Sequence, residues 1–442
     1  MTMNAPVNRL AAEEAWRAAC GRIAEAGREA EPIWLVEARR EACAAFAENG
    51  LPSPRAEDWR WSNIHRWLAS PYPPLAGDAD AGSAGAGDIG ALLADNPFAG
   101  MEASLMVFVN GRLDGEHSSI VPQEGVEIGN LAGCSKAPAW LDGSFRADDA
   151  VDQLNMALAG DGLVVRVAAG VKAARPLVVV NVTEGDGHSV ALRHVLRLEE
   201  GAELCLVEAH VGGGDHVANV VTRLDVGEGA RLSRVNVNLK DERALQLANV
   251  EARVAGQGRF HDVALLMGGR YHRQQDFISF AGEGAAARAD CAYLLRGAQH
   301  ADTRLVVDHA APHCTSRETF KCVMDEAARG AFQGLIRVAP GALKTDGQMA
   351  AHGLLLGETA EFDAKPELEI YADDVICAHG ATTGALDEEQ LFYLRARGID
   401  ERRARALLIA AFVGEVFDEV ENEAAKAALA ALAEGWLAGE AA

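Results

Sequence analysis

Between Ser104 and Ala385, hydrophobic residues occur in short runs that glycine or charged residues separate. Runs of about five or six residues that are rich in β-branched side chains predict strands. No long helical pattern connects these runs, so this part of the chain is predicted to be mainly β. The runs include SLMVFV, GLVVRV, PLVVVNV, ALRHVLRL, ELCLVEAHV, NVVTRL, RLSRVNVNL and DVALLM.

A phrase made of a turn and the start of a strand recurs along the same region. It reads GAEL at Gly201, GARL at Gly229 and GRF at Gly258, about 28 residues apart, and returns as GAF at Gly330 and GAL at Gly341. Imperfect repetition of this period in a β region favours a parallel β-helix, whose coils stack roughly 4.8 Å apart. A β-sandwich is the alternative, but the segment has few credible Asn-Gly or Asp-Gly hairpin turns.

Helical patterns follow the β region. Asp387 is the predicted N-cap of one helix, which Gly398 ends, and Asp400 is the predicted N-cap of a second. A third stretch, from about Glu421 to Trp436, is rich in Ala and Leu. Because an exposed strand edge must be covered, we expect this small bundle to close the open end of the β-helix.

Helical patterns also precede the β region within residues 8–48, and the small residues from Pro74 to Gly90 are typical of a linker. The chain therefore divides into three expected regions. Residues 1–95 form an N-terminal helical region with the linker, residues 96–385 form the β-helix core, and residues 386–442 form a C-terminal helical domain.

Composition narrows the possible partners. The 442 residues include 65 Asp or Glu and 41 Lys or Arg, which gives a formal charge of −24. Nucleic acid is a poor candidate ligand, because phosphate binding needs clustered cations. The eight cysteines form no CxxC pair, which is typical of a reducing compartment. With no apolar run of signal-peptide or membrane-span length, we expect a cytoplasmic protein without membrane contact.

The strongest candidate chemistry lies in the phrase VICAHG. In an extended strand, Cys377 and His379 point to one face while Ile376 and Ala378 point to the other. A thiolate and an imidazole on one face form half of a site for a soft metal or an iron–sulfur fragment. The remaining ligands must come from another coil or another chain. On spacing alone, the simpler interpretation is favoured, in which Cys377 is a small buried side chain and His379 a turn residue.

A second group of potential ligands lies upstream and comprises His300, His309, His313, Cys314 and Cys322. Pro312 disfavours the helix that would align two of its histidines, and no zinc spacing fits. Turn residues with a buried thiol are the favoured interpretation. Asp373 and Asp374 are adjacent, so on a strand they face opposite ways and do not form a glycosidase pair. They are better explained as solvated turn charges.

The sequence resembles the SufD family, a component of the sulfur-mobilisation machinery that assembles iron–sulfur clusters. The matching phrases cover nearly the whole chain: GLPSPRAEDWRW near residue 50, DHAAPHCTSRETFK from Asp308, FQGLIRVAPGALKTDGQM from Phe332, and KPELEIYADDVICAHGATTGALDEEQLFYLRARGI. The related SufB scaffold carries a cysteine just ahead of its LLL strand. Here AAHGLLLG has His352 and no thiol at that point, which favours SufD.

The resemblance implies a right-handed parallel β-helix between N- and C-terminal α-helical regions. It also implies pairing with a SufB-like paralogue through the end of the β-helix, docking of a SufC-like ATPase on the C-terminal helices, and cluster assembly at the SufB interface. The family's motif cysteine and histidine fall on Cys377 and His379, and the histidine works with a cysteine of SufB. We place ATPase contacts on the C-terminal helices at Phe392, Tyr393, Arg397, Phe412 and Val416.

The expected role is a non-enzymatic scaffold subunit that holds iron or a cluster only transiently, at the interface with SufB, and binds none stably alone. A homodimer is possible when the chain is isolated. The family's usual Lys and Ser are Ile376 and Ala378 here, on the strand face opposite His379. The alternatives are a purely structural activator of the ATPase and a β-helix carbohydrate-active enzyme. The second is disfavoured by the 6% aromatic content and the lack of a signal peptide.

Overall fold

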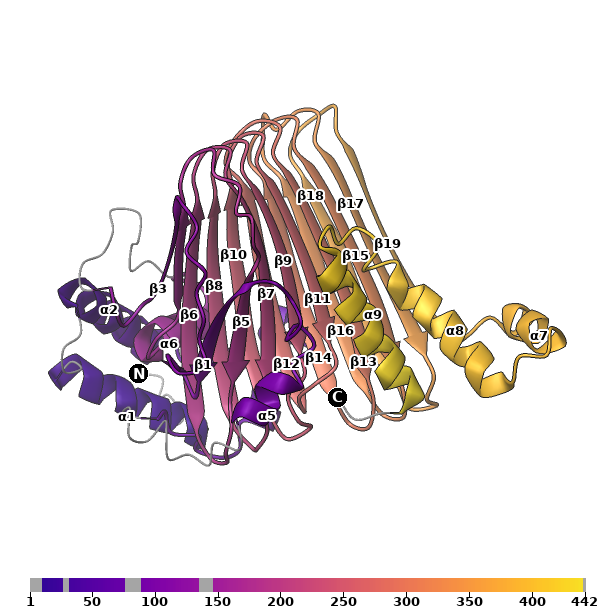
Figure 1. The fold of residues 1–442 in the computed structure, drawn as a ribbon, viewed down its shortest axis with the longest axis horizontal. Coiled ribbons are helices and arrows are strands. Elements are labelled where there is room, and N and C mark those ends of the chain that lie inside the picture. The colour runs from indigo at the N-terminus through magenta and orange to yellow at the C-terminus, as the bar shows by residue number, and fades with distance from the viewer. Residues whose placement is uncertain (1–9, 27–31, 76–88, 135–145, 440–442) are drawn as a thin grey trace, which may run out of the picture.

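The computed structural model describes residues 10–26, 32–75, 89–134 and 146–439. Its strands form two sheets that wind as a parallel β-solenoid of about eight turns, with helices along its sides (Figure 1). This confirms the mainly β fold with flanking helices. The division into three regions stays a prediction, and most of the predicted linker, residues 76–88, lies outside the described residues.

From β4 onward, the strands alternate between the two sheets along the chain. The nine-stranded sheet, here sheet A, has the order β18-β16-β14-β12-β10-β8-β6-β4-β3. Its strands are β3 Val126–Asn130, β4 Leu163–Val167, β6 Ser189–Leu198, β8 Val217–Val226, β10 Leu245–Val254, β12 Tyr271–Phe280, β14 His300–His309, β16 Arg329–Val338 and β18 Glu361–Ile370.

The ten-stranded sheet, here sheet B, has the order β19-β17-β15-β13-β11-β9-β7-β5-β1-β2. Its strands are β1 Ser104–Val109, β2 Arg112–Leu113, β5 Leu177–Val182, β7 Glu203–Val211, β9 Arg231–Asn238, β11 Arg259–Leu266, β13 Ala286–Leu295, β15 Thr315–Met324, β17 Asp346–Leu355 and β19 Ile376–Gly384. Each strand from β5 onward pairs in parallel with the strand two places later. Side chains therefore stack in columns along both sheets.

Four of the five glycine phrases mark the corner at which the chain passes from sheet A to sheet B, while GAF at Gly330 lies inside β16. Gly201 and Gly229 lie there with φ of 65° and 64°, a conformation that glycine adopts without strain. Gln257 and His313 take the same left-handed conformation at the corresponding corners, with φ of 55° and 58°. The period in the sequence thus reflects one corner geometry repeated coil after coil.

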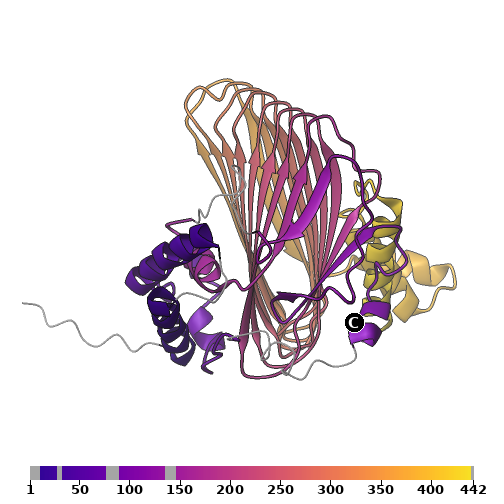
Figure 2. The same cartoon turned by 60° about the vertical axis from the view of Figure 1, so that its left-hand side comes forward.

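The remaining regular elements are helices. They are α1 Ala11–Ala26, α2 Ile33–Asn49, the 3-10 turn η1 Glu57–Trp59, α3 Ile64–Trp67, α5 Ile89–Ala94, α6 Ala150–Leu158, α7 Glu388–Ala396, α8 Glu401–Gly414 and α9 Glu423–Ala438. Figure 2 shows the N-terminal and C-terminal helices on opposite sides of the solenoid. In the described part of the chain, no helix is both long and apolar enough to cross a membrane.

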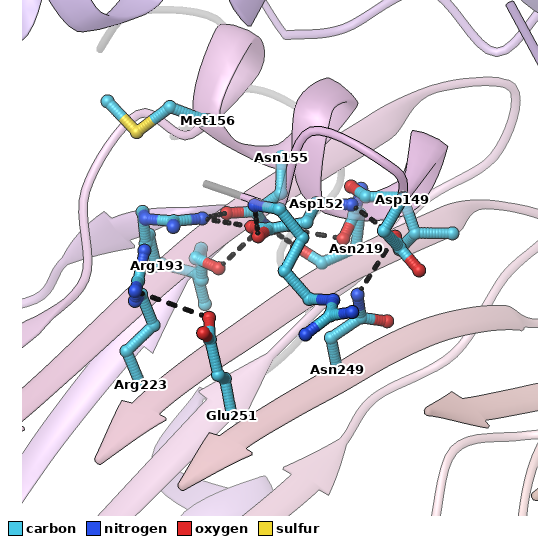
Figure 3. A network of polar contacts seen from close by, with 12 residues as sticks. Asp149, Asp152, Asn155, Met156, Arg193, Asn219, Arg223, Asn249 and Glu251 are labelled. Carbon is cyan, nitrogen blue, oxygen red and sulfur yellow. Dashed lines mark hydrogen bonds and ion pairs between the residues drawn. The ribbon is translucent and has the colours of Figure 1, made fainter. Parts of the chain in front are cut away.

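A buried polar network fixes α6 on the outer face of sheet A (Figure 3). Arg193 of β6 pairs with Asp152 of α6 at 2.7 Å, and both side chains are almost fully buried. The same guanidinium donates to Asn155 at 3.1 Å. Asn249 of β10 donates at 3.0 Å to Asp149, the N-cap of α6. These bonds satisfy polar groups that burial would otherwise leave unpaired.

The C-terminal helices cover the side of sheet B rather than its end. Their predicted N-caps are confirmed, since Asp387 and Asp400 accept from backbone N–H groups of the first turns of α7 and α8. Apolar side chains of α8 and α9 pack against outward-facing Val235, Val263 and Val323. The expectation that the bundle closes the open end of the β-helix is therefore wrong. The reason is that the outer face of sheet B is itself apolar and takes up the apolar stripe of the helices.

The two ends of the solenoid differ. At the N-terminal end, β2 and β3 pair in antiparallel fashion with β1 and β4. At the C-terminal end, β18 and β19 are the last strands of their sheets, and no described residue pairs with their outer edges. Most residues of β19 are exposed. The chain thus ends its solenoid on two open strand edges.

Candidate functional site

The phrase VICAHG lies on β19 at this open end. Cys377 stands in register with Gly347 of β17, and His379 with Met349. Cys377 packs against the interior cluster of the solenoid, whereas Ile376 is 68% exposed on the outer side. Because side chains alternate along a strand, His379 shares the inner face with Cys377. The structure thus brings the two predicted ligands to one face, at the rim of the solenoid interior.

The two side chains differ in accessibility. Cys377 is half-buried, and burial raises the pKa of its thiol, with smaller contributions from Asp346 and Glu318. His379 is exposed. Across the described residues, no group of three or more His, Cys, Asp or Glu side chains has metal-binding geometry. Cys377 and His379 therefore form two ligands of a site that a second chain would have to complete.

Directly below the rim lies a buried polar chain that the sequence did not predict. Met349 covers Glu318 of β15 in register, and the Glu318 carboxyl group is fully buried with one oxygen unpartnered. Ser316 hydrogen bonds to that carboxyl group, and the Ser316 hydroxyl lies 3.0 Å from His309 Nε2. Burial raises the pKa of Glu318 to about 8 and lowers the pKa of His309 to about 4. Both groups are therefore held in their neutral forms near pH 7.

The second group of potential ligands does not converge. His300 stacks on Tyr271 at 5.7 Å on the outer side of sheet A, while His309 and Cys322 face the interior. His313 is an exposed corner residue, and Cys314 is buried beside it. The favoured interpretation, turn residues with a buried thiol, is correct for His313 and Cys314 but wrong for His300, His309 and Cys322, which lie in strands β14 and β15. Asp373 and Asp374 also lie in a turn, where Asp374 pairs with Lys344.

A small cavity separates the outer face of β19 from α7 and α8. It has a volume of about 320 Å³ and is lined by residues of β15, β17, β19 and both helices. Within it, His352 Nδ1 lies 2.7 Å from Thr382 Oγ1, and Lys321 pairs with Glu415 at 2.6 Å. Lys321 also lies over the ring of Phe412 at 4.7 Å. The Lys321 contacts connect α8 to β15, the third strand from the open end of sheet B, and the His352 contact joins β17 to β19.

The side chains assigned to an ATPase contact differ in exposure. Phe392 and Tyr393 of α7 are 73% and 58% exposed, and Arg397 donates to the Tyr393 hydroxyl at 3.0 Å. Phe412 is half-buried against Lys321. Val416 is completely buried between the helices and sheet B, so it can affect a partner only through the position of α8. The exposed apolar surface is thus on α7, which extends beyond the last strand (Figure 1).

Comparison with known proteins places this geometry in a family. The model described as "SUF system FeS cluster assembly, SufBD core domain" matches residues 180–412, and the model "SufBD protein N-terminal region" matches residues 27–179. The chain belongs to the SufBD family of iron–sulfur cluster assembly proteins. The core match covers the solenoid from the end of β5 through most of α8, including Cys377 and His379.

Curated SufBD relatives match along most of the chain. The iron–sulfur cluster assembly protein SufD of Escherichia coli is 31% identical over 383 residues, which cover 85% of this chain and 87% of that protein. A SufBD family protein of Synechocystis is 26% identical over 87% of both chains. SufD of Bacillus subtilis is 26% identical over 64% of this chain and 65% of its own length. The SufD-like character inferred from the motifs agrees with these matches.

Sequence reasoning also missed a row of charges on the outer face of β18. Glu361, Asp363, Lys365, Glu367 and Glu369 occupy alternate positions of this edge strand. The alternation was visible in the phrase EFDAKPELEI, but its position at a sheet edge was not. This row lies across the solenoid end from the Cys377 and His379 strand.

Proposed function

We propose that this SufBD chain is a non-enzymatic scaffold subunit. It pairs with a SufB-like paralogue through the open end of its solenoid, and the nascent iron–sulfur cluster is the cargo assembled between the two chains. The observation that carries the proposal is the position of Cys377 and His379 on the inner face of an unpaired edge strand. Two ligands at an open rim are suited to a site that is completed from outside.

The edge strands support the partner assignment. An unpaired strand edge is a template for another chain, and soluble proteins normally cover or blunt it. In this molecule β19 carries no charged side chain over Ile376–Gly384. A second solenoid would continue both sheets at once and place its own ligands beside His379. The relatives named SufD, which assemble iron–sulfur clusters, agree with this role.

An ATPase similar to SufC would dock on the C-terminal helices. Phe392 and Tyr393 give α7 an exposed aromatic surface, which is uncommon on a helix without a partner. Through Lys321, Phe412 and Glu415, α8 is joined to β15, so a movement of these helices would reach the last strands of sheet B. We propose a cytoplasmic location for this assembly.

The first experiment is an affinity purification of the tagged chain from its own host under anaerobic conditions. Recovery of a SufB-like chain with an ATPase supports the scaffold. Recovery of the chain alone, under gentle conditions, contradicts the proposed partners. The purified complex is then rebuilt with His379→Ala and supplied with Fe(II) and sulfide, and cluster formation is followed by visible absorption and Mössbauer spectra.

We expect His379→Ala to leave the complex intact and to abolish cluster formation, because one of two ligands from this chain is lost. The matched control is His313→Asn, which removes an exposed corner imidazole and keeps a residue that tolerates φ of 58°. If the His379→Ala complex forms clusters normally, the hypothesis of a purely structural activator of the ATPase is favoured instead. A carbohydrate-active enzyme has no support from the family match.

A further inference from the structure

Charged side chains form ladders along the outer face of sheet A. Asp225 of β8 pairs with Arg197 of β6 at 3.4 Å and with Arg253 of β10 at 3.3 Å. These three residues occupy the same position in successive coils. Opposite charges that face each other across neighbouring strands stabilise a sheet. Asp225, the middle residue of the three, has a partner of opposite charge on both sides.

The same column continues to the open end after one interruption, at Ser279. Beyond it, Arg337 of β16 pairs with Asp308 of β14 at 3.6 Å and with Glu369 of β18 at 2.9 Å. A second column, of two residues from β16 and β18, joins Arg329 to Glu361 at 3.2 Å. Both columns therefore end on a carboxylate of the last strand.

These terminal carboxylates have a partner on one side only. Within the described residues, the ion pairs of Glu361 and Glu369 are those with the arginines of β16 beneath them. Their side chains are 51% and 42% exposed. The whole outer face of β18 carries four acidic residues and one lysine, Lys365, which bonds to Glu57 and Glu367. The edge therefore presents net negative charge to any strand that pairs with it.

We propose that the partner strand which adds to β18 carries Lys or Arg side chains opposite Glu361 and Glu369, so that the ion ladders of sheet A continue across the interface. This inference rests on the proposed function, because it specifies the chemistry of the partner at the same solenoid end. In this proposal, the charges at the edge of sheet A select the partner. The uncharged strand β19 of sheet B carries the proposed ligands Cys377 and His379. The occupant is a second β-solenoid with a basic outer face on its terminal strand.

The same row disfavours pairing between two copies of this chain. In an antiparallel pairing of β18 with itself centred on Lys365, Glu361 faces Glu369 of the second copy. In that register Asp363 also faces Glu367, and the two lysines face each other. A shift of one strand by two residues sets Asp363 opposite Glu369 and Lys365 opposite Glu367 of the second copy, so repulsive and attractive contacts are then equal in number. Like charges directly opposite each other destabilise a strand pair, which favours a different partner.

The test measures the affinity of the full chain for the SufB-like paralogue of the same organism, by titration calorimetry at 50 and 500 mM NaCl. The variant Glu361→Lys/Glu369→Lys should weaken binding about tenfold at low salt, since attraction at two exposed pairs becomes repulsion. At high salt the loss should shrink to about threefold or less, because exposed charges are screened. A second variant, Glu361→Gln/Glu369→Gln, should lose about threefold at low salt.

The matched control is Glu200→Lys/Glu228→Lys, which makes the same change in net charge at exposed corner residues of the middle coils. It should bind within about twofold of the unchanged chain. If both β18 variants fold and bind as the control does, the ladder proposal is overturned while the proposed partner stands. If the unchanged chain does not bind the paralogue at all, the proposed function fails with it. Circular dichroism and the melting temperature of each variant establish that it is folded.

Discussion

Removal of the Arg193 guanidinium should detach α6 from sheet A at a large cost in stability. In Arg193→Met, the Asp152 carboxylate, 2% exposed, loses its 2.7 Å ion pair. It keeps one backbone hydrogen bond, from the N–H of Arg146 at 2.6 Å. Asn155 also loses its bond from the guanidinium (Figure 3). The variant thus leaves the buried Asp152 carboxylate with one of these two partners.

The expected cost follows from the distance. Two charges 2.7 Å apart attract by about 6 kcal/mol at an effective dielectric constant of about 20. Part of this is offset because methionine, unlike arginine, is buried without losing hydration. Removing one member of a buried ion pair generally costs about 3–5 kcal/mol, which is a large fraction of the roughly 5–15 kcal/mol that stabilises a typical domain.

The assay is urea unfolding followed by tryptophan fluorescence, with hydrogen exchange at Ala150–Leu158 as a local readout. The double variant Asp152→Leu/Arg193→Met should recover most of the loss, since no unpaired charge remains. The control is Arg223→Met, which breaks a more exposed pair with Glu251 at 3.3 Å and should cost about 1 kcal/mol or less. A cost below about 1 kcal/mol for Arg193→Met alone would refute this account of how α6 is held.

Two further predictions concern the open end and α7. Burial raises the pKa of Glu318 to about 8, with Asp290 adding to the shift and Ser316 and Arg317 opposing it. The folded state therefore keeps a proton that the unfolded state releases near pH 4.5. The contribution of Glu318 to the free energy of unfolding is greatest below about pH 4.5 and is lost as the pH rises towards 8. Glu318→Gln should gain stability relative to the unchanged chain as the pH rises from 5 to 8, and the gain should level off above pH 8. The free energy of unfolding is measured by urea titration. An equal difference between variant and unchanged chain at pH 5 and pH 8.5 would contradict the raised pKa of Glu318. Phe392→Ala/Tyr393→Ala should weaken binding of the co-purifying ATPase at least tenfold and leave the melting temperature within about 1 °C, because these rings are 73% and 58% exposed. Unchanged ATPase binding in pull-downs would exclude α7 as the docking surface.

Periodicity was sufficient to predict the solenoid, because one corner geometry recurs in every coil. It was not sufficient to place the C-terminal helices. The phrase PLVVVNV is apolar at every position but one, which is typical of a parallel strand buried on both faces. Helices were needed on the outer side of sheet B for that reason, and α8 and α9 fulfil this need rather than covering the end.

Alternation along β19 was sufficient to place Cys377 and His379 on one face. The groups beneath them could not be predicted, because coil lengths vary and the stacking partners depend on the register. The residues Thr315, Asp346 and Ile376, which stack in one column, are not evenly spaced in the sequence. Glu318 was therefore not recognisable as the buried carboxyl group below the rim, and the charges of β18 were not recognisable as the end of a ladder.

The asymmetry of the solenoid ends also limits what the molecule can build. Strands stacked in parallel could in principle be extended without limit, as in a fibril. Among the described residues, the short antiparallel strands β2 and β3 end the sheets on one side, whereas the long strands β18 and β19 end them with parallel open edges on the other. A molecule whose long open strand edges lie at one end can pair with one neighbour, and the assembly then stops at two chains. The fold therefore terminates its own growth at a pair and avoids filaments.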